Sequence, residues 1–156
     1  MPRLRYTRCV SSISSGSGPK GAGGQHPRLH HVALGARNVA AVAAFYRDLL
    51  GLPELSRHHD ADGHLRSIWL DLGGPILMVE RTGEPLRHAR GVGAGPFLLA
   101  LSATGRERDE LERSLAAAGF PVESRTEHTI YLRDAEGNRV AVSSYLRETV
   151  SSVTEK

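Results

Sequence analysis

An internal repeat constrains the fold of this chain more than any other feature of its sequence. The apolar segment His31–Leu34 precedes an amphipathic stretch that stops at Gly51–Pro53, and Leu98–Leu101 precedes a second stretch that stops at Gly119–Pro121. The two spacings agree within one residue. A repeat of this size is a supersecondary unit that cannot bury its own apolar face, so the two units must pack together. A ligand is expected in the cleft between them.

Each unit is predicted to contain a strand, a helix and three further strands. They cover residues 30–36, 39–50, 55–58, 64–72 and 75–81 in the first unit, and 97–102, 106–118, 122–125, 129–133 and 139–144 in the second. The first helix is expected because apolar residues recur at spacings of three and four between an N-cap, Asn38, and a stop, Gly51. The predicted fold is α+β: two tandem β-α-β-β-β units form a curled mixed sheet around a cleft, with the helices outside.

The two units form one predicted domain at residues 28–146. Their boundaries fall at about residues 28–82 and 96–146, and residues 83–95 form a glycine-rich linker. Residues 147–156 are polar and are predicted to be a frayed C-terminal tail.

Residues 1–27 are predicted to be a disordered basic tail. They are rich in Ser, Gly and Arg and show neither helical nor strand periodicity. Gly16, Gly18 and Gly21 match a dinucleotide-binding string, but no strand precedes them and no helix follows, so the match carries no nucleotide site. The acid-free composition also fits an organelle transit peptide.

Composition argues against several classes of partner. The net charge of +3 comes from the tail, because residues 1–27 contain four of the 20 basic residues and none of the 17 acidic ones. The rest of the chain carries about −1, so no nucleic-acid surface is expected on the folded domain. No apolar run approaches the roughly 18 residues that cross a membrane. Cys9 is the only cysteine, which rules out an internal disulfide and favours a cytoplasmic location.

Three segments of the chain resemble the vicinal oxygen chelate superfamily, which groups glyoxalase I, bleomycin-resistance proteins, fosfomycin-resistance enzymes and extradiol dioxygenases. These segments are His30–Leu34, Phe45–Leu52 and Arg133–Val140. The resemblance covers roughly residues 29–145 and implies the tandem-unit fold. It leaves the activity open, because this scaffold carries many chemistries.

The resemblance implies a divalent-metal site with ligands from four positions. His31 fills the first position and Glu80 the second. Leu98 and Ala141 fill the third and fourth, and neither side chain can bind a metal. A catalytic metal typically has about three protein ligands and an open position, so His31 and Glu80 are an incomplete set.

Other histidines are weaker candidates for a metal site. Two histidines are candidates for a third metal ligand beside His31 and Glu80: His128, which precedes a predicted strand, and His88, in the linker. Three more histidines surround a predicted hairpin turn at residues 60–63: His58, His59 and His64. Solvated polar residues are the norm at turns, so this turn is interpreted as a solvated surface.

Two functions remain open from the sequence. The first is a small-molecule-binding protein that needs no cofactor. Its ligand cleft is lined by six residues: His31, Glu80, Met78, Trp69, Leu98 and Ala141. The second is a divalent-metal-dependent lyase, isomerase or dioxygenase that uses His31 and Glu80. The sequence assigns no catalytic residue and does not identify the ligand.

A homodimer is expected in either case. The resemblance implies it, and short edge strands of a curled sheet need cover that a symmetric partner supplies. The linker is flexible enough for the units to pair within one chain or between two.

Overall fold

The computed structural model describes residues 28–85, 92–93 and 95–145. The predicted tails at 1–27 and 147–156 and most of the linker lie outside these residues. The first unit contains β1 (His31–Ala36), α1 (Val39–Ala44), a π-helical turn η1 (Phe45–Leu49), β2 (Glu54–His59), β3 (Leu65–Asp71) and β4 (Ile76–Arg81). The second contains β5 (Leu99–Ser102), α2 (Gly105–Ala117), β6 (Ser124–Arg125), β7 (Thr129–Arg133) and β8 (Arg139–Ser143).

The two units repeat one topology, as the sequence predicts. The strand order is β1-β4-β3-β2 in the first sheet and β5-β8-β7-β6 in the second. The pairs β1–β4 and β5–β8 are parallel, and the other pairs are antiparallel. The fold is therefore the predicted α+β arrangement, with the strands in two separate four-stranded sheets instead of one continuous curled sheet.

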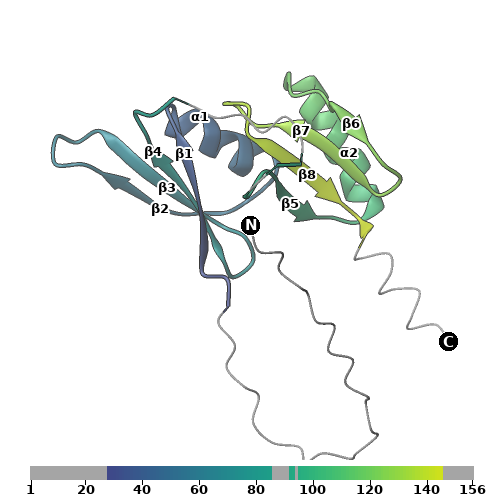
Figure 1. Cartoon of the computed structure of the whole chain (residues 1–156), viewed down its shortest axis with the longest axis horizontal. Coiled ribbons are helices and arrows are strands. Elements are labelled where there is room, and N and C mark those ends of the chain that lie inside the picture. Colours follow the sequence, from purple (N-terminus) through teal and green to yellow (C-terminus); the bar gives the residue numbers. More distant parts are fainter. Residues whose placement is uncertain (1–27, 86–91, 94, 146–156) are drawn as a thin grey trace, which may run out of the picture.

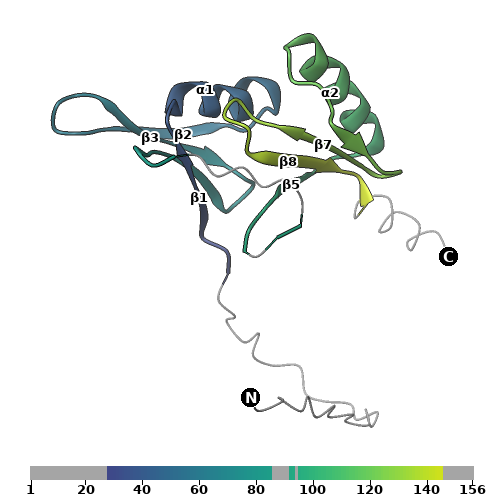
Figure 2. The same ribbon diagram turned by 45° about the horizontal axis from the view of Figure 1, so that its top comes forward.

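Both helices cover the same side of the sheets. Figure 1 shows the two units side by side, and in Figure 2 α1 and α2 both lie above the strands, with no helix on the opposite sheet faces. The helix α1 packs on β3 and β4, and α2 packs on β8 and on η1. Apolar residues that alternate along the strands of the first sheet are buried under α1: Ile68, Leu70, Leu77 and Val79. A ligand is therefore expected on the sheet faces that no helix covers.

Local sequence signals define the helix ends and turns. The Asn38 side chain accepts a hydrogen bond from Ala41 N–H at 3.0 Å, so Asn38 is the predicted N-cap. Gly51 ends the first helical segment at φ 74°, in the left-handed region that glycine adopts without a Cβ clash. Thr104 and Glu107 form a capping box at the start of α2.

The end of the first helix differs from the prediction. The segment 39–50 was expected to be one α-helix, but Phe45–Leu49 form a π turn, closed by a 3.3 Å hydrogen bond from Leu50 N–H to the Phe45 carbonyl. Phe45 and Tyr46 in this turn are both buried, and each contacts the second unit. Apolar spacing of three and four does not encode contacts with a distant segment, so it could not predict the wider turn.

One core joins the two units. The Phe45 and Phe120 rings lie edge to face with centroids 4.9 Å apart. The same buried cluster contains Val42 and Leu77 from the first unit and Leu132 from the second. The units therefore share their hydrophobic stabilisation.

The β7–β8 turn holds the first helix from the second unit. The buried Asp134 carboxylate accepts hydrogen bonds from the Tyr46 hydroxyl at 3.2 Å and from Asn138 N–H at 2.9 Å. Glu136 accepts from Arg37 N–H at 2.8 Å and from Asn38 N–H at the start of α1. Burial, and then the Asp134 charge, raise the pKa of Tyr46 well above 10. The hydroxyl therefore stays protonated at neutral pH and acts as a hydrogen-bond donor to Asp134.

Candidate functional site

The helix-free face of the first sheet carries most of the residues that were predicted to line a ligand cleft. Side chains alternate along a strand, and the observed register shows which of them share this face. On β1 and β4 they are His31, Ala33, Gly35, Ile76, Met78 and Glu80, and on β2 and β3 they are Ser56, His58, Ser67, Trp69 and Asp71, the last residue of β3. We call this set the open face.

Two rows of the open face cross the sheet side by side. His58, Ser67 and Glu80 are paired in register across β2, β3 and β4. The neighbouring row contains Ser56, Trp69 and Met78. The open face thus combines an aromatic and an apolar side chain with hydroxyl, imidazole and carboxylate groups, a composition typical of small-molecule sites.

His31 and Glu80 lie on the open face at different positions along their strands. His31 is paired with Ile76, whereas Glu80 is paired with Gly35. The offset of four residues corresponds to about 13 Å along the strands at roughly 3.3 Å per residue. The position across from His31 is therefore an apolar side chain, and the structure does not place the two predicted ligands side by side.

His31 and Glu80 form no hydrogen bond or ion pair with each other in the described part of the chain. The Nδ1 atoms of His31 and His30 lie 2.9 Å apart, so the hydrogen-bond partner of His31 is its neighbour in sequence. Within residues 28–85, 92–93 and 95–145, no hydrogen bond or ion pair is made by the Glu80 carboxylate. Glu80 is half-buried and keeps its acceptor capacity for another group.

Two buried polar atoms lie beside Glu80 on the open face. The Ser67 hydroxyl, on a fully buried residue, and the Trp69 indole N–H have no hydrogen-bond partner in the described part of the chain. The His58 ring covers Trp69 with a centroid distance of 4.4 Å and bonds Ser56 Oγ through Nε2 at 2.9 Å. A buried polar group without a partner is costly, and a ligand bound across these two rows would relieve that cost.

The second sheet presents apolar residues at the other two predicted ligand positions. Ala141 is paired with Ala100 and Tyr131 on the helix-free face of this sheet and is buried. Leu98 directly precedes β5 and is half-buried. His128, a candidate third ligand, lies next to Tyr145 at a ring distance of 5.6 Å. His88 lies outside the described residues.

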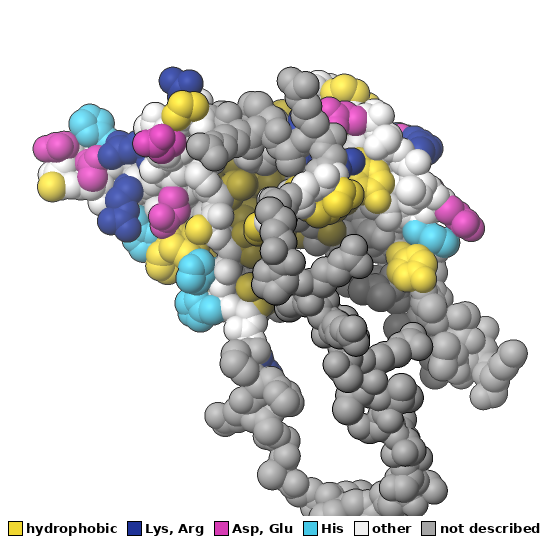
Figure 3. All heavy atoms as spheres, in the orientation of Figure 1, with side chains coloured by type: hydrophobic (Ala, Val, Ile, Leu, Met, Phe, Trp, Pro, Cys, Tyr) yellow, Lys and Arg dark blue, Asp and Glu magenta, His cyan; other side chains and the backbone are white. Residues whose placement is uncertain are grey.

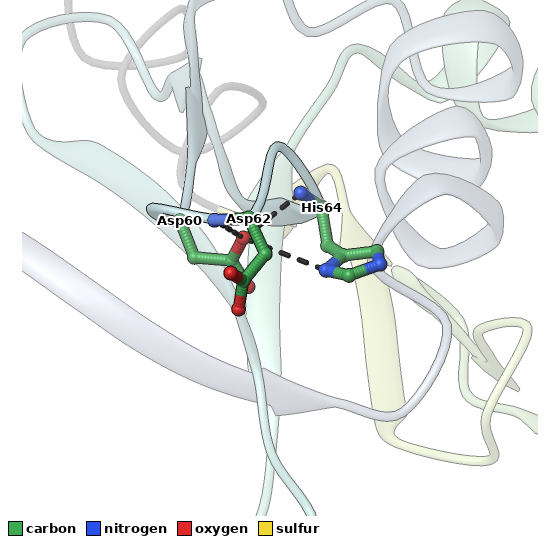
Figure 4. Close-up of side chains that lie close together, drawn as sticks. All are labelled: Asp60, Asp62 and His64. Atoms are coloured by element: carbon green, nitrogen blue, oxygen red, sulfur yellow. Dashed lines mark hydrogen bonds and ion pairs between the residues drawn. The ribbon is translucent and has the colours of Figure 1, made fainter.

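The β2–β3 turn brings three potential metal ligands together. Ligand atoms of Asp60, Asp62 and His64 all lie within 4.8 Å of one another (Figure 4). Of the other two histidines expected around this turn, His58 contacts Trp69, and His59 is exposed at the end of β2, directly before Asp60. Figure 3 shows charged and histidine side chains gathered over this end of the first unit and hydrophobic ones in the hollow between the units.

Existing partners already occupy the Asp60 carboxylate. One oxygen accepts from His64 N–H at 2.9 Å and Asp62 N–H at 3.1 Å, and the other pairs with Arg81. The Arg81 hydrogen bond, followed by the His64 backbone, lowers the pKa of Asp60 from 3.8 to about 2. A metal cation at this turn would have to displace the Arg81 guanidinium. We therefore interpret the turn as an Asx turn that is stabilised by a salt bridge.

Acid titration tests this role of Asp60. A depressed folded-state pKa stabilises the protein above the unfolded pKa near 4, and this contribution is lost as the pH falls through about 2. Asp60→Asn is expected to reduce the fall in thermal midpoint between about pH 4 and pH 2, measured by circular dichroism. Asp62→Asn, an exposed change in the same turn, is the control. An unchanged acid slope in Asp60→Asn contradicts the assignment.

Sequence reasoning missed Ser56, Ser67 and the role of His58 on the open face. Ser67 lies two positions before Trp69, so strand alternation alone was enough to place it on that face. The pairing of His58 with this row was not available from the sequence, because β2–β3 register depends on bulges at Glu54/Ser56 and His58/His59.

Comparisons with known proteins agree with this architecture. The family model described as Glyoxalase/Bleomycin resistance protein/Dioxygenase superfamily matches residues 28–142. The fosfomycin resistance protein FosX from Listeria monocytogenes superposes with a TM-score of 0.64 at 15% identity, over 77% of this chain and 92% of that one. A glyoxalase/dioxygenase from Nostoc punctiforme gives a TM-score of 0.63 at 21% identity, over 87% and 98%.

A third similar structure is that of a lyase. Lactoylglutathione lyase from Agrobacterium tumefaciens gives a TM-score of 0.57 at 24% identity, over 77% of this chain and 95% of that one. No curated protein sequence matches the chain. Identities this low show a shared fold, and the family model covers most of the chain. The chain belongs to the Glyoxalase/Bleomycin resistance protein/Dioxygenase superfamily.

Proposed function

We propose that this protein binds a small organic molecule on the open face of the first sheet, without metal chemistry. The observation that carries the proposal is that Ser67, Trp69 and Glu80, on two adjacent rows of the open face, have buried or half-buried polar groups that lack partners within the described residues. Met78 and the Trp69 ring supply apolar surface beside them. A ligand with both an apolar part and hydrogen-bonding groups suits these two rows.

The second sheet supports a binding role over catalysis by a bound metal. Two of the four positions where the superfamily resemblance implies ligands are Leu98 and Ala141, which have no donor atom. The remaining pair, His31 and Glu80, is offset by four residues in register. These residues do not fit a chelated divalent ion, which typically has about three protein ligands.

The alternative is a divalent-metal-dependent lyase, isomerase or dioxygenase. It is supported by His31, which is exposed on the open face, and by Glu80, which shares that face and keeps its acceptors. This function requires further ligands from outside the expected positions. The Asp60 turn is a separate cluster and already binds Arg81.

The experiment that separates the two functions uses Trp69, the only tryptophan. Its emission is expected to change when a library of small organic molecules is screened against the full chain, because the indole lies on the open face. Met78→Lys places a charge in the middle of that face and is expected to weaken binding of any hit at least about tenfold. Leu55→Lys, at a position that is 52% exposed, is the matched control.

Metal analysis completes the same test. Protein purified without a metal-affinity tag is expected to contain less than one equivalent of divalent metal per chain after incubation with zinc, nickel or manganese. One equivalent that is lost in His31→Ala contradicts the proposal and supports the enzyme. Hits that bind Met78→Lys as tightly as the unaltered protein also contradict it.

We further propose that the protein is a homodimer. The faces of both sheets opposite the helices are open in the described part of the chain, and the edges of β1 and β5 are not paired with each other there. A symmetric partner covers such edges and faces. Pairing within a chain or between chains brings one copy of His31, Glu80, Leu98 and Ala141 to each cleft, so exchange does not add metal ligands.

A further inference from the structure

A pocket lies where the two units meet, at the ends of their strands, and reaches the open face only at Asp71. The segment after η1 contributes Leu50 and Leu52, the end of β3 and the following turn contribute Asp71 and Leu72, and α2 contributes Leu111. The pocket volume is about 440 Å³. Pockets of roughly 300–1,000 Å³ hold small organic molecules.

An adjoining hollow extends this pocket along α2. It has a volume of about 490 Å³ and shares four lining residues with the pocket: Leu50, Ser102, Ala103 and Leu111. Its outer wall contains Glu107 and Glu110. The two hollows form one continuous groove, which we call the seam groove.

The floor of the seam groove is apolar. Leu50 and Leu111 are half-buried and pack against both hydrophobic clusters of the protein. Leu52 and Leu72 are also half-buried and pack against the larger cluster. Their uncovered surfaces at the seam are available to the apolar part of a ligand.

The charges of the seam groove are all acidic. Asp71, Glu107 and Glu110 line it, and no Lys, Arg or His is among its lining residues in the described part of the chain. Glu107 caps α2 and Glu110 pairs with Arg106 at 2.9 Å.

Asp71 differs from the two glutamates. Its carboxylate accepts hydrogen bonds from the backbone N–H groups of Gly74 at 3.0 Å and Gly73 at 2.8 Å, which lower its pKa, and no described cation pairs with it. A fixed anion at an apolar wall attracts a cation more strongly than one in open water.

We propose that the seam groove binds an organic cation with an apolar body. The protonated amine pairs with Asp71, and the apolar body lies on Leu50 and Leu111. A neutral or anionic molecule of the same shape lacks the charge pair, or is repelled, so the groove selects by charge as well as by shape. Asp71 is the last residue of the open face, whereas Leu50 and Leu111 lie outside it, and the proposal does not depend on a ligand bound at Ser67, Trp69 and Glu80.

The test uses 4-phenylbutylamine as the probe and 4-phenylbutanol as its neutral counterpart, with the full chain and isothermal titration calorimetry at pH 7. The amine is expected to bind at least about fivefold more tightly than the alcohol. Asp71→Asn keeps an oxygen for the two glycine N–H groups but removes the charge, and is expected to abolish this preference. Asp62→Asn, an exposed acid on the β2–β3 turn, is the control and is expected to change nothing.

A blocking variant tests the location. Ser102 is exposed and lines both hollows, so Ser102→Trp fills the groove without disturbing the core and is expected to abolish binding of both probes. Thermal unfolding checks that both variants fold. Equal affinities for the amine and the alcohol, or amine binding unaffected by Asp71→Asn and Ser102→Trp, overturn the proposal. So does an absence of amine binding together with self-association that Ser102→Trp abolishes, because the groove is then an interface between copies.

Discussion

Phe45→Ala is expected to lower the free energy of unfolding by about 3–5 kcal/mol, the usual cost of truncating a buried phenylalanine. Phe45 is 2% exposed, and its ring packs edge to face on Phe120 at 4.9 Å and on Tyr46 at 5.1 Å. The truncation leaves a cavity between the units, where neither unit can close it alone. Urea denaturation followed by circular dichroism measures the loss.

Leu55→Ala is the control for this change. Leu55 is 52% exposed, so its truncation is expected to change the free energy of unfolding by less than about 0.5 kcal/mol. A loss below about 1 kcal/mol in Phe45→Ala means that the two units do not share a core.

Asp134→Ala is expected to cost about 3 kcal/mol, although it removes few apolar contacts. The carboxylate is 4% exposed and accepts from Tyr46 Oη at 3.2 Å, Glu136 N–H at 3.0 Å and both Asn138 N–H and Nδ2 at 2.9 Å. Alanine leaves these donors without an acceptor, and each unsatisfied buried donor costs roughly 1–3 kcal/mol before relaxation.

Two milder variants divide this cost. Asp134→Asn keeps an acceptor in place and is expected to lose less stability than the alanine variant. Tyr46→Phe removes only the hydroxyl that crosses between the units and is expected to cost about 1 kcal/mol. The free energies of unfolding come from the same urea titrations. If Asp134→Ala is no less stable than Tyr46→Phe, the β7–β8 turn does not depend on its carboxylate.

Much of the architecture was predictable because its determinants are local. The N-cap at Asn38, the left-handed stop at Gly51 and the turn at Asp60–Gly63 depend on residues within a few positions of one another. The alternation that buries Ile68 and Leu70 leaves Trp69 on the other face, as predicted. These features, repeated in a second unit, are sufficient for the tandem-unit fold.

The candidate site was predictable only in part. Met78 and Glu80 are two positions apart, so strand alternation puts them on one face, and the β1–β4 register puts His31 on that face too. The register between β1 and β4 was not predictable, because this pairing joins segments more than 40 residues apart and has no local determinant. The offset between His31 and Glu80 therefore emerged only from the folded sheet.

The sequence by itself determined the repeat, the order of elements and the absence of ligand atoms at Leu98 and Ala141, because these depend on residue type and short-range spacing. Tertiary structure alone decided the π turn at Phe45–Leu49, the Asp134 contact with Tyr46 and the groove between the units. Each of these depends on contacts between segments that are far apart in the sequence. The free energy of such contacts is distributed over residues that no local sequence pattern connects.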